Sequence, residues 1–485
     1  MQNNKYDIII IGAGIVGCLI ARFLSKYNKR ILLIEKQIDI GMNTSSANSA
    51  IIHAGYDPKP NTKKALLNVK GNKLWHEIAP ELGIPFKKTG SFVVAIGKDE
   101  FKKLFELFDR GIANGVPGLK ILSKDELLQK EPLVNPNAVG ALFAPTAAVI
   151  DPFTATLAAA ENAKLNGVDF LFETAFIDFI FENKKIIGII TNKGNFFSKW
   201  VINSAGVYSD EIAHKANTLL DVSIIPRKGE YIIFDSSKFF INNVLFPIPS
   251  ENSKGCLIST TTHGNVMIGP NANPAKDKED TETTKEGMEE IIKNAKKLIP
   301  SIDEKNSIAI FAGIRSTPNT PEKDFIIEIP KNVYGLINLC GIESPGFASA
   351  PAIALYVIEL LKNTGEKLDE KKDFNPIRKP FVHFHLLSYK EREELIKKNP
   401  AYGRIVCRCE EVTEGEIIDA IHSPIPAKTY DGIKRRTWLG TGRCQGAFDY
   451  PRVIKILAKE LNLPEEKITK KGSGSEIIFR KTKDF

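Results

Sequence analysis

Cysteine is scarce in this sequence, and no apolar run is long enough to cross a membrane. The 485 residues include 6 cysteines, too few for a disulfide framework, so we expect reduced thiols or metal ligands. No stretch approaches the roughly 20 apolar residues that span a bilayer. The N-terminal segment also lacks the basic region and the cleavage site of a signal peptide. These absences predict a cytoplasmic protein, with at most a peripheral association at the inner membrane surface.

A strong excess of one charge is also missing. The chain has 66 Lys and Arg against 58 Asp and Glu, a net charge of +8 at pH 7. Acidic and basic residues alternate, except in the locally basic tail 467–485. This balance does not favour nucleic acid as a partner and fits a small anionic substrate. With 43% hydrophobic residues, the chain has an ordinary globular composition and is long enough for two or three domains.

The N-terminal motif combines a strand, a glycine turn and a helix. The β-branched run "YDIIII" (6–11) is typical of a buried parallel strand, and Gly12, Gly14 and Gly17 follow it at the start of an apolar helical stretch. Such glycines let the backbone approach a pyrophosphate, which then lies at the positive end of the helix. A second strand ends at Glu35, where a carboxylate can bind a ribose hydroxyl. The motif predicts dinucleotide binding without separating FAD from NAD.

Further along the chain, polar and glycine-rich segments fit a large cofactor. Residues 37–61 are rich in Ser, Thr, Asn and Gly and offer hydroxyl, amide and backbone groups. Two more strand-turn-helix units lie far apart, at 200–216 ("WVINSAGVYSDEIAHKA") and 335–361 ("GLINLCGIESPGFASAPAIALYVIELL"). These distant units predict one parallel sheet that an inserted domain interrupts.

Together with "FAGIRSTP" (311–318), these motifs resemble the FAD-dependent oxidoreductases of the D-amino-acid oxidase superfamily. Within that group they are most similar to bacterial FAD-dependent glycerol-3-phosphate oxidases and dehydrogenases. The resemblance covers about residues 5–365 and implies a Rossmann-type FAD-binding domain with an inserted substrate domain. Four segments with alternating β-branched and aromatic residues fit the mixed sheet of that substrate domain, namely 90–97, 228–235, 256–270 and 308–316. Residues 272–300 fit a loop followed by a surface helix.

His53 is the candidate catalytic residue. A lone histidine beside apolar residues is more often part of a core, but the family's "NSGVIH" motif matches residues 48–53, with Ala50 in place of its glycine. The resemblance implies that His53 is the base that removes the substrate hydroxyl proton while flavin N5 accepts the hydride. It also implies a set of substrate-binding residues, Ser49, His53, Lys254 and Arg315. Arg is well shaped to bind phosphate or carboxylate, whereas Lys254 is alternatively a solvated lysine and Arg315 a structural arginine.

The resemblance also implies which residues bind the cofactor. Ser344 lies in a turn whose amides and helix start would face the flavin pyrimidine, where a helix N-terminus stabilises negative charge; an ordinary helix cap is the alternative. The full set of expected FAD-binding residues is Gly12, Gly14, Val16, Gly17, Glu35, Thr44, Ser45, Ser49, Ala50, Ile51, Phe176, Ala205, Gly206, Gly341, Ser344, Gly346 and Phe347.

A separate unit begins near residue 401. The segment "YGRIVCRCEEV…GTGRCQGAFDYPRV" resembles a small module similar to bacterioferritin-associated ferredoxin, in which a Cys-x-Cys pair and a later Cys-x4-Cys pair hold a 2Fe-2S cluster. This chain keeps Cys407, Cys409 and Cys444, but has Asp449 at the fourth position. Thiolate is the usual ligand and a carboxylate is a harder donor. Three possibilities therefore remain open: a cluster completed by Asp449 or by an outside ligand, a site for another metal, and a docking module without metal. The other cysteines lie in apolar stretches and fit packing roles.

The expected architecture is therefore α/β, with a Rossmann-type FAD-binding domain, an inserted mixed-sheet substrate domain and a small C-terminal helical module. The limits that we expect are 1–85, 145–215 and 320–365 for the discontinuous FAD-binding domain, 86–144 and 216–319 for the substrate domain, 366–400 for a charged linker, 401–455 for the ferredoxin-like module and 456–485 for a tail.

The expected activity is the oxidation of sn-glycerol 3-phosphate to dihydroxyacetone phosphate in glycerol metabolism. The additional module favours a dehydrogenase that passes electrons to an acceptor protein or a quinone, with oxidase activity left open. An L-2-hydroxyglutarate oxidase or dehydrogenase is one alternative, because it shares the flavin fold and the histidine motif and replaces phosphate by carboxylate. A non-catalytic flavin subunit of an electron-transfer complex is another. The sequence does not determine the oligomeric state.

Overall fold

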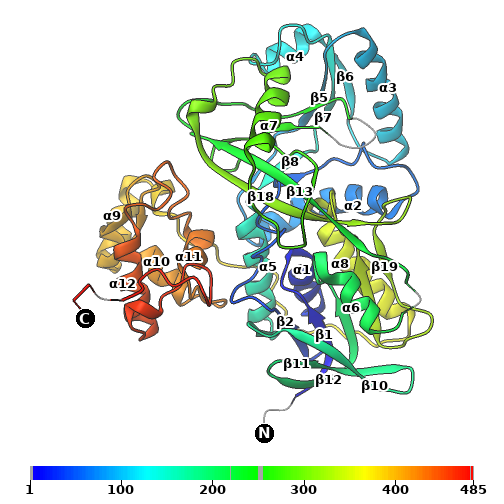
Figure 1. The fold of residues 1–485 in the computed structure, drawn as a ribbon, viewed down its shortest axis with the longest axis vertical. Coiled ribbons are helices and arrows are strands. Elements are labelled where there is room, and N and C mark those ends of the chain that lie inside the picture. The colour runs from blue at the N-terminus through cyan, green and yellow to red at the C-terminus, as the bar shows by residue number, and fades with distance from the viewer. Residues whose placement is uncertain (1–3, 219, 250–254, 481, 484–485) are drawn as a thin grey trace.

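Two large sheets and a small helical module make up the described part of the chain. The structure is a computed structural model that describes residues 4–218, 220–249, 255–480 and 482–483. Figure 1 shows one sheet with its helices in the lower half and the second sheet in the upper half. The C-terminal module, in orange and red, lies to one side, next to α5 (Pro152–Leu165). Residue Lys254, which the sequence predicts to bind substrate, lies outside the described residues.

The first sheet is built around parallel strands. Within the described residues it contains β1 (Lys5–Ile11), β2 (Ile31–Ile34), β9 (Asp169–Leu171), β10 (Phe176–Glu182), β11 (Lys185–Thr191), β12 (Gly194–Asn203), β19 (Ile326–Glu328) and β20 (Leu336–Cys340). The strand order runs β10-β11-β12-β1-β2-β9, and β20 also pairs with β12. The pairs β1–β2, β1–β12, β12–β20 and β2–β9 are parallel. The parallel part of this sheet agrees with the prediction from the separated strand-turn-helix units, whereas the pairs β10–β11, β11–β12 and β19–β20 are antiparallel.

Helices cover the parallel strands, which explains the apolar runs in these strands. The helices of this part are α1 (Ile15–Leu24), α2 (Lys63–Glu81), α5, α6 (Ser209–Lys215) and α8 (Gly346–Asn363). All residues of β2 are buried, and α1 packs against both α5 and α8. Cys18 lies in the core formed by these elements. Burial raises the pKa of its thiol, as expected for a cysteine that has only a packing role.

The second sheet is mixed and carries the four alternating segments that the sequence assigns to a substrate domain. Its strands are β5 (Ser91–Ala95), β6 (Lys120–Ser123), β7 (Gly140–Ala144), β13 (Ile224–Phe234), β14 (Val244–Pro247), β15 (Leu257–Thr260), β16 (Val266–Gly269), β17 (Asn273–Pro274) and β18 (Ser307–Pro318). The helices α3 (Lys98–Ala113), α4 (Lys124–Lys130) and α7 (Lys285–Leu298) pack on it. Only one side of α7 is buried, through Ile291, Ala295 and Leu298, so the predicted surface helix is confirmed.

A small sheet connects the segment that contains His53 to the rest of the molecule. It consists of β3 (Ile51–Ile52), β4 (Phe86–Lys87) and β8 (Ala148–Ile150). In the β3–β8 pair, Ile51 lies opposite Val149 and both side chains are buried. This pairing fixes the backbone immediately before His53.

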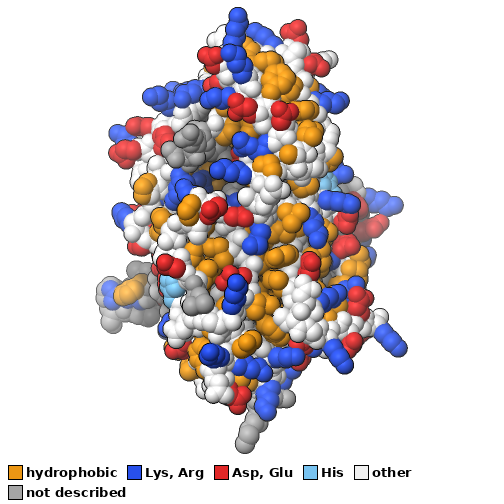
Figure 2. Space-filling view, turned by 90° about the vertical axis from the view of Figure 1, so that its right-hand side faces the viewer, with side chains coloured by type: hydrophobic (Ala, Val, Ile, Leu, Met, Phe, Trp, Pro, Cys, Tyr) orange, Lys and Arg blue, Asp and Glu red, His pale blue; other side chains and the backbone are white. Residues whose placement is uncertain are grey.

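The C-terminal module has its own apolar core. It contains β21 (Ile405–Cys407), β22 (Val412–Thr413), α10 (Glu414–Ile421), α11 (Tyr430–Thr437) and α12 (Tyr450–Leu461), and the helix α9 (Tyr389–Lys398) precedes it. The predicted fold class is confirmed by these three parts, whereas the residue limits of the domains stay a prediction. No helix in the described ranges combines the length and the apolar character that a membrane span needs. Figure 2 shows acidic and basic side chains intermixed on the face in view.

Candidate functional site

The glycine turn after β1 leaves no room for side chains. Gly12 has a φ of 103°, and a Cβ on it would lie 2.7 Å from the carbonyl oxygen of Ser204. A Cβ on Gly17 would lie 2.0 Å from the carbonyl oxygen of Gly12. Gly12 and Gly17 therefore allow β1, α1 and the segment after β12 to approach one another closely. Gly14 is the N-cap of α1 and provides no side chain to cap it, whereas the Ile15 amide at this helix end donates to Ser45 Oγ.

A cavity of about 250 Å³ opens beside this turn. It is lined by eight of the residues that the sequence predicts to bind FAD, namely Gly12, Gly14, Glu35, Thr44, Ser45, Phe176, Ala205 and Gly206. The structure adds lining residues that the sequence interpretation did not select, among them Ile11, Lys36, Met42, Thr174, Ser204, Tyr208, Glu211 and Lys215. The cavity thus brings together segments from four separate parts of the chain.

Glu35 lies at the end of β2, where the sequence predicts a ribose-binding carboxylate. Its Oε2 accepts a hydrogen bond from the Ala13 amide at 2.8 Å, and its Oε1 accepts one from the Gln37 amide at 2.9 Å. Burial raises the pKa of this carboxyl, an effect that the backbone donors oppose. These bonds hold the carboxylate against the glycine turn, within the lining of the cavity.

The loop from Thr44 to Ala50 connects the glycine turn to the second sheet. Ser45 Oγ accepts a hydrogen bond from the Ile15 amide at 2.9 Å, whereas Thr44 Oγ1 donates one to the Ile314 carbonyl at 2.8 Å. Within the loop, Asn48 Oδ1 accepts a bond from the Ala50 amide. Ala50 has a φ of 54°, in the left-handed region that favours glycine. This conformation explains why glycine suits the position in the family motif to which residues 48–53 are similar.

His53 follows β3 and is half-buried. Its carbonyl oxygen accepts hydrogen bonds from Asn68 Nδ2 at 2.7 Å and from Asn72 Nδ2 at 3.2 Å, and both donors lie on α2. Its imidazole ring lies 5.7 Å from the ring of Phe246 on β14, centre to centre. Two helix side chains therefore fix the backbone of His53, and its ring faces the second sheet.

Strand β18 connects the predicted substrate and cofactor residues. A Cβ on Gly313 would lie 2.0 Å from the Ala47 carbonyl oxygen, so this strand packs directly on the loop before Ser49. Half-buried Arg315 extends from the same strand, and its Nη2 donates a hydrogen bond to the Asn271 carbonyl at 2.9 Å. At the end of the strand, Thr317 Oγ1 donates to Glu343 Oε2 at 2.7 Å. One strand thus contacts the segments that contain Thr44, Ser49 and Ser344.

The turn before α8 is shaped by a glycine, and its serine does not cap the helix. Gly341 has a φ of 67°, and a Cβ on it would contact Pro318. Pro345 is the N-cap of α8, without a side-chain cap bond, whereas Ser344 is exposed. The alternative that Ser344 is an ordinary helix cap is therefore wrong. Nine of the predicted FAD-binding residues do not line the cavity of 250 Å³, namely Val16, Gly17, Ser49, Ala50, Ile51, Gly341, Ser344, Gly346 and Phe347. The flavin-binding roles of these nine, and of the eight that line the cavity, stay predictions.

In the C-terminal module, the cysteines of the ferredoxin-like motif come together. Cys409 Sγ lies 3.7 Å from Cys407 Sγ and 3.3 Å from Cys444 Sγ. Asp449 lies within hydrogen-bonding reach of the Cys407 thiol. We call these four side chains the thiol pocket. Among the residues that the structure describes, no three His, Cys, Asp or Glu side chains are arranged to hold a single metal ion. The donor set of three thiols and one carboxylate does match the number of protein ligands of a 2Fe-2S cluster.

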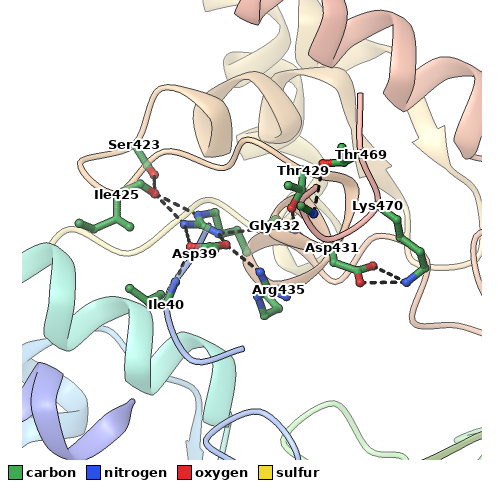
Figure 3. A network of polar contacts seen from close by, with 12 residues as sticks. Asp39, Ile40, Ser423, Ile425, Thr429, Asp431, Gly432, Arg435, Thr469 and Lys470 are labelled. Carbon is green, nitrogen blue, oxygen red and sulfur yellow. Dashed lines mark hydrogen bonds and ion pairs between the residues drawn. The ribbon is translucent and has the colours of Figure 1, made fainter. Parts of the chain in front are cut away.

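A buried ion pair attaches the module to the loop after β2 (Figure 3). Arg436 on α11 donates to both carboxylate oxygens of Asp39, from Nη1 at 2.8 Å and from Nη2 at 2.9 Å. Arg435 donates to the same carboxylate at 2.8 Å. Burial alone would raise the pKa of Asp39, but the two guanidinium groups lower it to about 2. Since Asp39 is followed by Gly41 and Met42 in the cavity lining, the module is anchored next to the cofactor cavity.

A second contact between the module and the body involves Trp438, at the end of α11. Its ring lies 3.3 Å from the ring of His263, in the β15–β16 turn, and stacks on His383 at 4.2 Å, centre to centre. His263 Nε2 in turn lies 2.9 Å from Asp151 Oδ2, at the start of α5. The segment before the module and the second sheet therefore both contact the module through this tryptophan.

We expect Arg436→Met to destabilise the docked module by about 3 kcal/mol, because it leaves a buried carboxylate without its bidentate partner. Thermal denaturation and limited proteolysis between residues 366 and 400 would measure the loss. Lys470→Met is the matched control, since it removes the exposed Lys470–Asp431 pair of the same module and is expected to change stability by less than about 1 kcal/mol. Equal behaviour of the two variants would contradict the anchoring role of Arg436.

Comparisons with known proteins match both parts of the chain. The profile of the FAD dependent oxidoreductase family matches residues 7–360, and that of the BFD-like 2Fe-2S binding domain matches residues 405–459. A glycerol 3-phosphate dehydrogenase of Caloramator mitchellensis is 47% identical over 481 residues, which are 99% of each chain. A glycerol 3-phosphate oxidase of Mycoplasma genitalium is 34% identical and covers 76% of this chain and 97% of its own.

A solved structure shows the same similarity in three dimensions. The dithionite-reduced L-alpha-glycerophosphate oxidase of Mycoplasma pneumoniae with FAD bound is 33% identical, with a TM-score of 0.74. The similarity covers 78% of this chain and 100% of that chain. The Caloramator relative matches this chain over nearly its full length, whereas the two Mycoplasma oxidases match about three quarters of it.

Proposed function

Because this chain belongs to the family of FAD-dependent oxidoreductases, we propose that it is a dehydrogenase that oxidises sn-glycerol 3-phosphate to dihydroxyacetone phosphate. The observation that carries this proposal is the 47% identity with a glycerol 3-phosphate dehydrogenase over 99% of both chains. The similarity includes the C-terminal module as well as the two large sheets. The identity of the reaction therefore rests on a relative with the same organisation.

The glycine turn and the adjoining cavity fit FAD. Side chains on Gly12 and Gly17 would clash with backbone atoms, so these glycines permit the tight strand-turn-helix geometry that dinucleotide-binding sites use. Glu35 is the residue that would bind a ribose, and Ser45 connects the loop to α1. When bound, FAD supplies the acceptor for the hydride that leaves C2 of the substrate.

His53 is proposed as the base that removes the proton from the C2 hydroxyl. Imidazole is suited to this step because its ordinary pKa lies near neutral pH. The bonds from Asn68 and Asn72 to its carbonyl oxygen keep its backbone in place, which limits the freedom of the ring to leave a productive orientation. The ring's contact with Phe246 gives it an apolar neighbour on the second sheet.

Arg315 is proposed to bind the substrate phosphate, together with Lys254 and Ser49. The guanidinium is half-buried, and its bond to the Asn271 carbonyl uses Nη2. A planar guanidinium forms two parallel bonds to a phosphate, which orients as well as attracts the anion. Because β18 packs on the loop before Ser49, a substrate held by Arg315 would be near the segment that contains His53.

The electron acceptor is proposed to be a protein or a quinone, reached by way of the C-terminal module. The module supports this choice because an enzyme that reduces oxygen directly has no need of a ferredoxin-like unit. Its attachment beside the cofactor cavity through Asp39 and Arg436 agrees with a role in the same electron path. A quinone acceptor would bring the protein to a membrane surface as a peripheral component.

Turnover with two substrates tests the proposed reaction. The purified protein is supplied with a dye as electron acceptor and with either sn-glycerol 3-phosphate or L-2-hydroxyglutarate. We expect dihydroxyacetone phosphate to accumulate in step with dye reduction, and no 2-oxoglutarate to form. Formation of 2-oxoglutarate without dihydroxyacetone phosphate would overturn the proposal and would indicate that Arg315 binds a substrate carboxylate and not a phosphate.

A further inference from the structure

Asp449 is an N-cap residue whose carboxylate does not cap its helix. Asp, Ser and Thr at helix N-caps normally accept a hydrogen bond from the first turn, as Asp151 does for α5 and Thr429 for α11. Asp449 begins α12 without such a bond. It is only 1% exposed, and its Oδ2 is buried without a hydrogen-bond partner. A buried carboxylate oxygen without a partner is costly, so this oxygen is positioned for a ligand.

The carboxylate lies in the wall of the thiol pocket. The four donors lie in one group, because Cys409 Sγ is 3.7 Å from Cys407 Sγ and 3.3 Å from Cys444 Sγ, and Asp449 adjoins Cys407. Gly442 lies directly against this group, since a Cβ there would lie 2.3 Å from Glu410 Oε1 and 2.8 Å from Cys409 Sγ. Four protein donors in one group are the number that the two iron atoms of a 2Fe-2S cluster take.

Tyr430 adds an unused donor next to the same pocket. The residue is 2% exposed, and its hydroxyl has no hydrogen-bond partner. Its ring stacks on Tyr450 with centres 4.0 Å apart, which fixes its orientation. A Cβ on Gly440 or on Gly446 would lie 2.7 Å or 2.2 Å from the hydroxyl oxygen. The hydroxyl therefore faces the loop that contains Cys444, in space that only glycines leave free.

We propose that the thiol pocket holds a 2Fe-2S cluster with the thiolates of Cys407, Cys409 and Cys444 and the carboxylate of Asp449 as its four ligands. The Tyr430 hydroxyl donates a hydrogen bond to the cluster or to one of its ligands. The assignment deepens the proposed function. The choice of ligands does not depend on that function, whereas the direction of electron flow, from the flavin to the cluster, rests on it. An oxygen ligand distinguishes this cluster from one with four thiolates, because carboxylate is a harder donor.

The test uses the full chain, purified without oxygen and reconstituted with iron and sulfide. Iron and sulfide per chain, the visible spectrum, the reduction potential, and the electron paramagnetic resonance of the dithionite-reduced protein are measured for four forms: wild type, Asp449→Ala, Asp449→Cys and Tyr430→Phe. We expect about two irons per chain in wild type. Asp449→Ala is expected to lose at least half of the iron, whereas Asp449→Cys should retain the iron and show a changed spectrum, as an all-thiolate cluster requires.

Tyr430→Phe is expected to keep its iron and to shift the cluster to a more negative reduction potential, because hydrogen bonds to the sulfur atoms raise it. Asp431→Asn is the matched control, since Asp431 pairs with Lys470 at the surface of the same module and should change none of these readouts. Circular dichroism verifies that each variant is folded.

Two results would overturn the assignment. One is that wild type binds no iron after reconstitution in the absence of oxygen, and the other is that both Asp449 variants keep the iron content and the spectrum of wild type. Flavin reduction by glycerol 3-phosphate is recorded for each form. If the proposed substrate is wrong, the flavin of wild type stays oxidised. If the ligand assignment is wrong, the flavin is still reduced and only the iron content and the spectra differ from the expected results.

Discussion

Replacing His53 by asparagine is expected to leave the flavin bound and to slow its reduction by glycerol 3-phosphate by about 10²- to 10⁴-fold, the usual contribution of a positioned base. Asparagine is similar in size to histidine but does not accept the hydroxyl proton. The bonds from Asn68 and Asn72 go to the backbone carbonyl of residue 53, so they persist in the variant. The loss should therefore appear in the rate of reduction and not in flavin content, both of which are followed by flavin absorbance under anaerobic conditions.

His422→Asn is the control for this experiment. His422 is exposed on the C-terminal module and pairs with Glu460 at 2.9 Å, away from the cofactor cavity. We expect wild-type reduction rates in this variant. If His53→Asn reduced its flavin as fast as His422→Asn, His53 would have no part in proton removal.

Replacing Arg315 by methionine is expected to lower kcat/KM for glycerol 3-phosphate by about 30- to several-thousand-fold, which corresponds to the 2–5 kcal/mol lost when one partner of a buried charge pair is removed. Methionine keeps the apolar part of the side chain on β18 while it removes the guanidinium. Lysine keeps the charge but loses the two parallel donors, so Arg315→Lys should fall between wild type and Arg315→Met. Steady-state turnover with a dye acceptor measures all three forms.

Arg404→Met is the matched control, because Arg404 forms an exposed pair with Glu414 on the module. It should leave kcat/KM unchanged. The loss in Arg315→Met should also be specific for the anion, so an uncharged alcohol such as glycerol should show little difference between wild type and variant. An equal loss with both alcohols would instead indicate that Arg315 maintains the structure of β18.

The sequence identifies the parts of the site that depend on local geometry. Gly12 and Glu35 could be predicted, because the turn and the end of the second strand follow directly from residues nearby in the chain. At position 50 the sequence has alanine where the family motif has glycine. The φ of 54° at Ala50 lies in the left-handed region, which glycine adopts more readily than alanine.

Other lining residues depend on which segments meet in three dimensions. Thr174 and Tyr208 line the cavity because β9 pairs with β2 and because the segment after β12 turns back over the glycine turn. Neither residue has a local motif. The role of β18 is also a tertiary property, since its contacts with Ala47, Thr44 and Glu343 join segments that are up to 270 residues apart.

In the C-terminal module, too, some features could be predicted from the sequence and others depend on the folded structure. The spacing of the cysteines indicates Asp449 as the fourth position, but its free carboxylate oxygen and the unused Tyr430 hydroxyl are visible only in the folded structure. The ion pair between Asp39 and Arg436 spans 397 residues and has no sequence signal. It is nevertheless one of the two contacts described above that hold the module against the body, and it lies beside the cofactor cavity.

The most direct test of the account is anaerobic mixing of the purified flavoprotein with sn-glycerol 3-phosphate while flavin absorbance is recorded. L-2-hydroxyglutarate is used in a parallel experiment. We expect rapid bleaching with the phosphate ester and none with the hydroxy acid. Bleaching by L-2-hydroxyglutarate alone, or by neither compound, would contradict the proposed reaction.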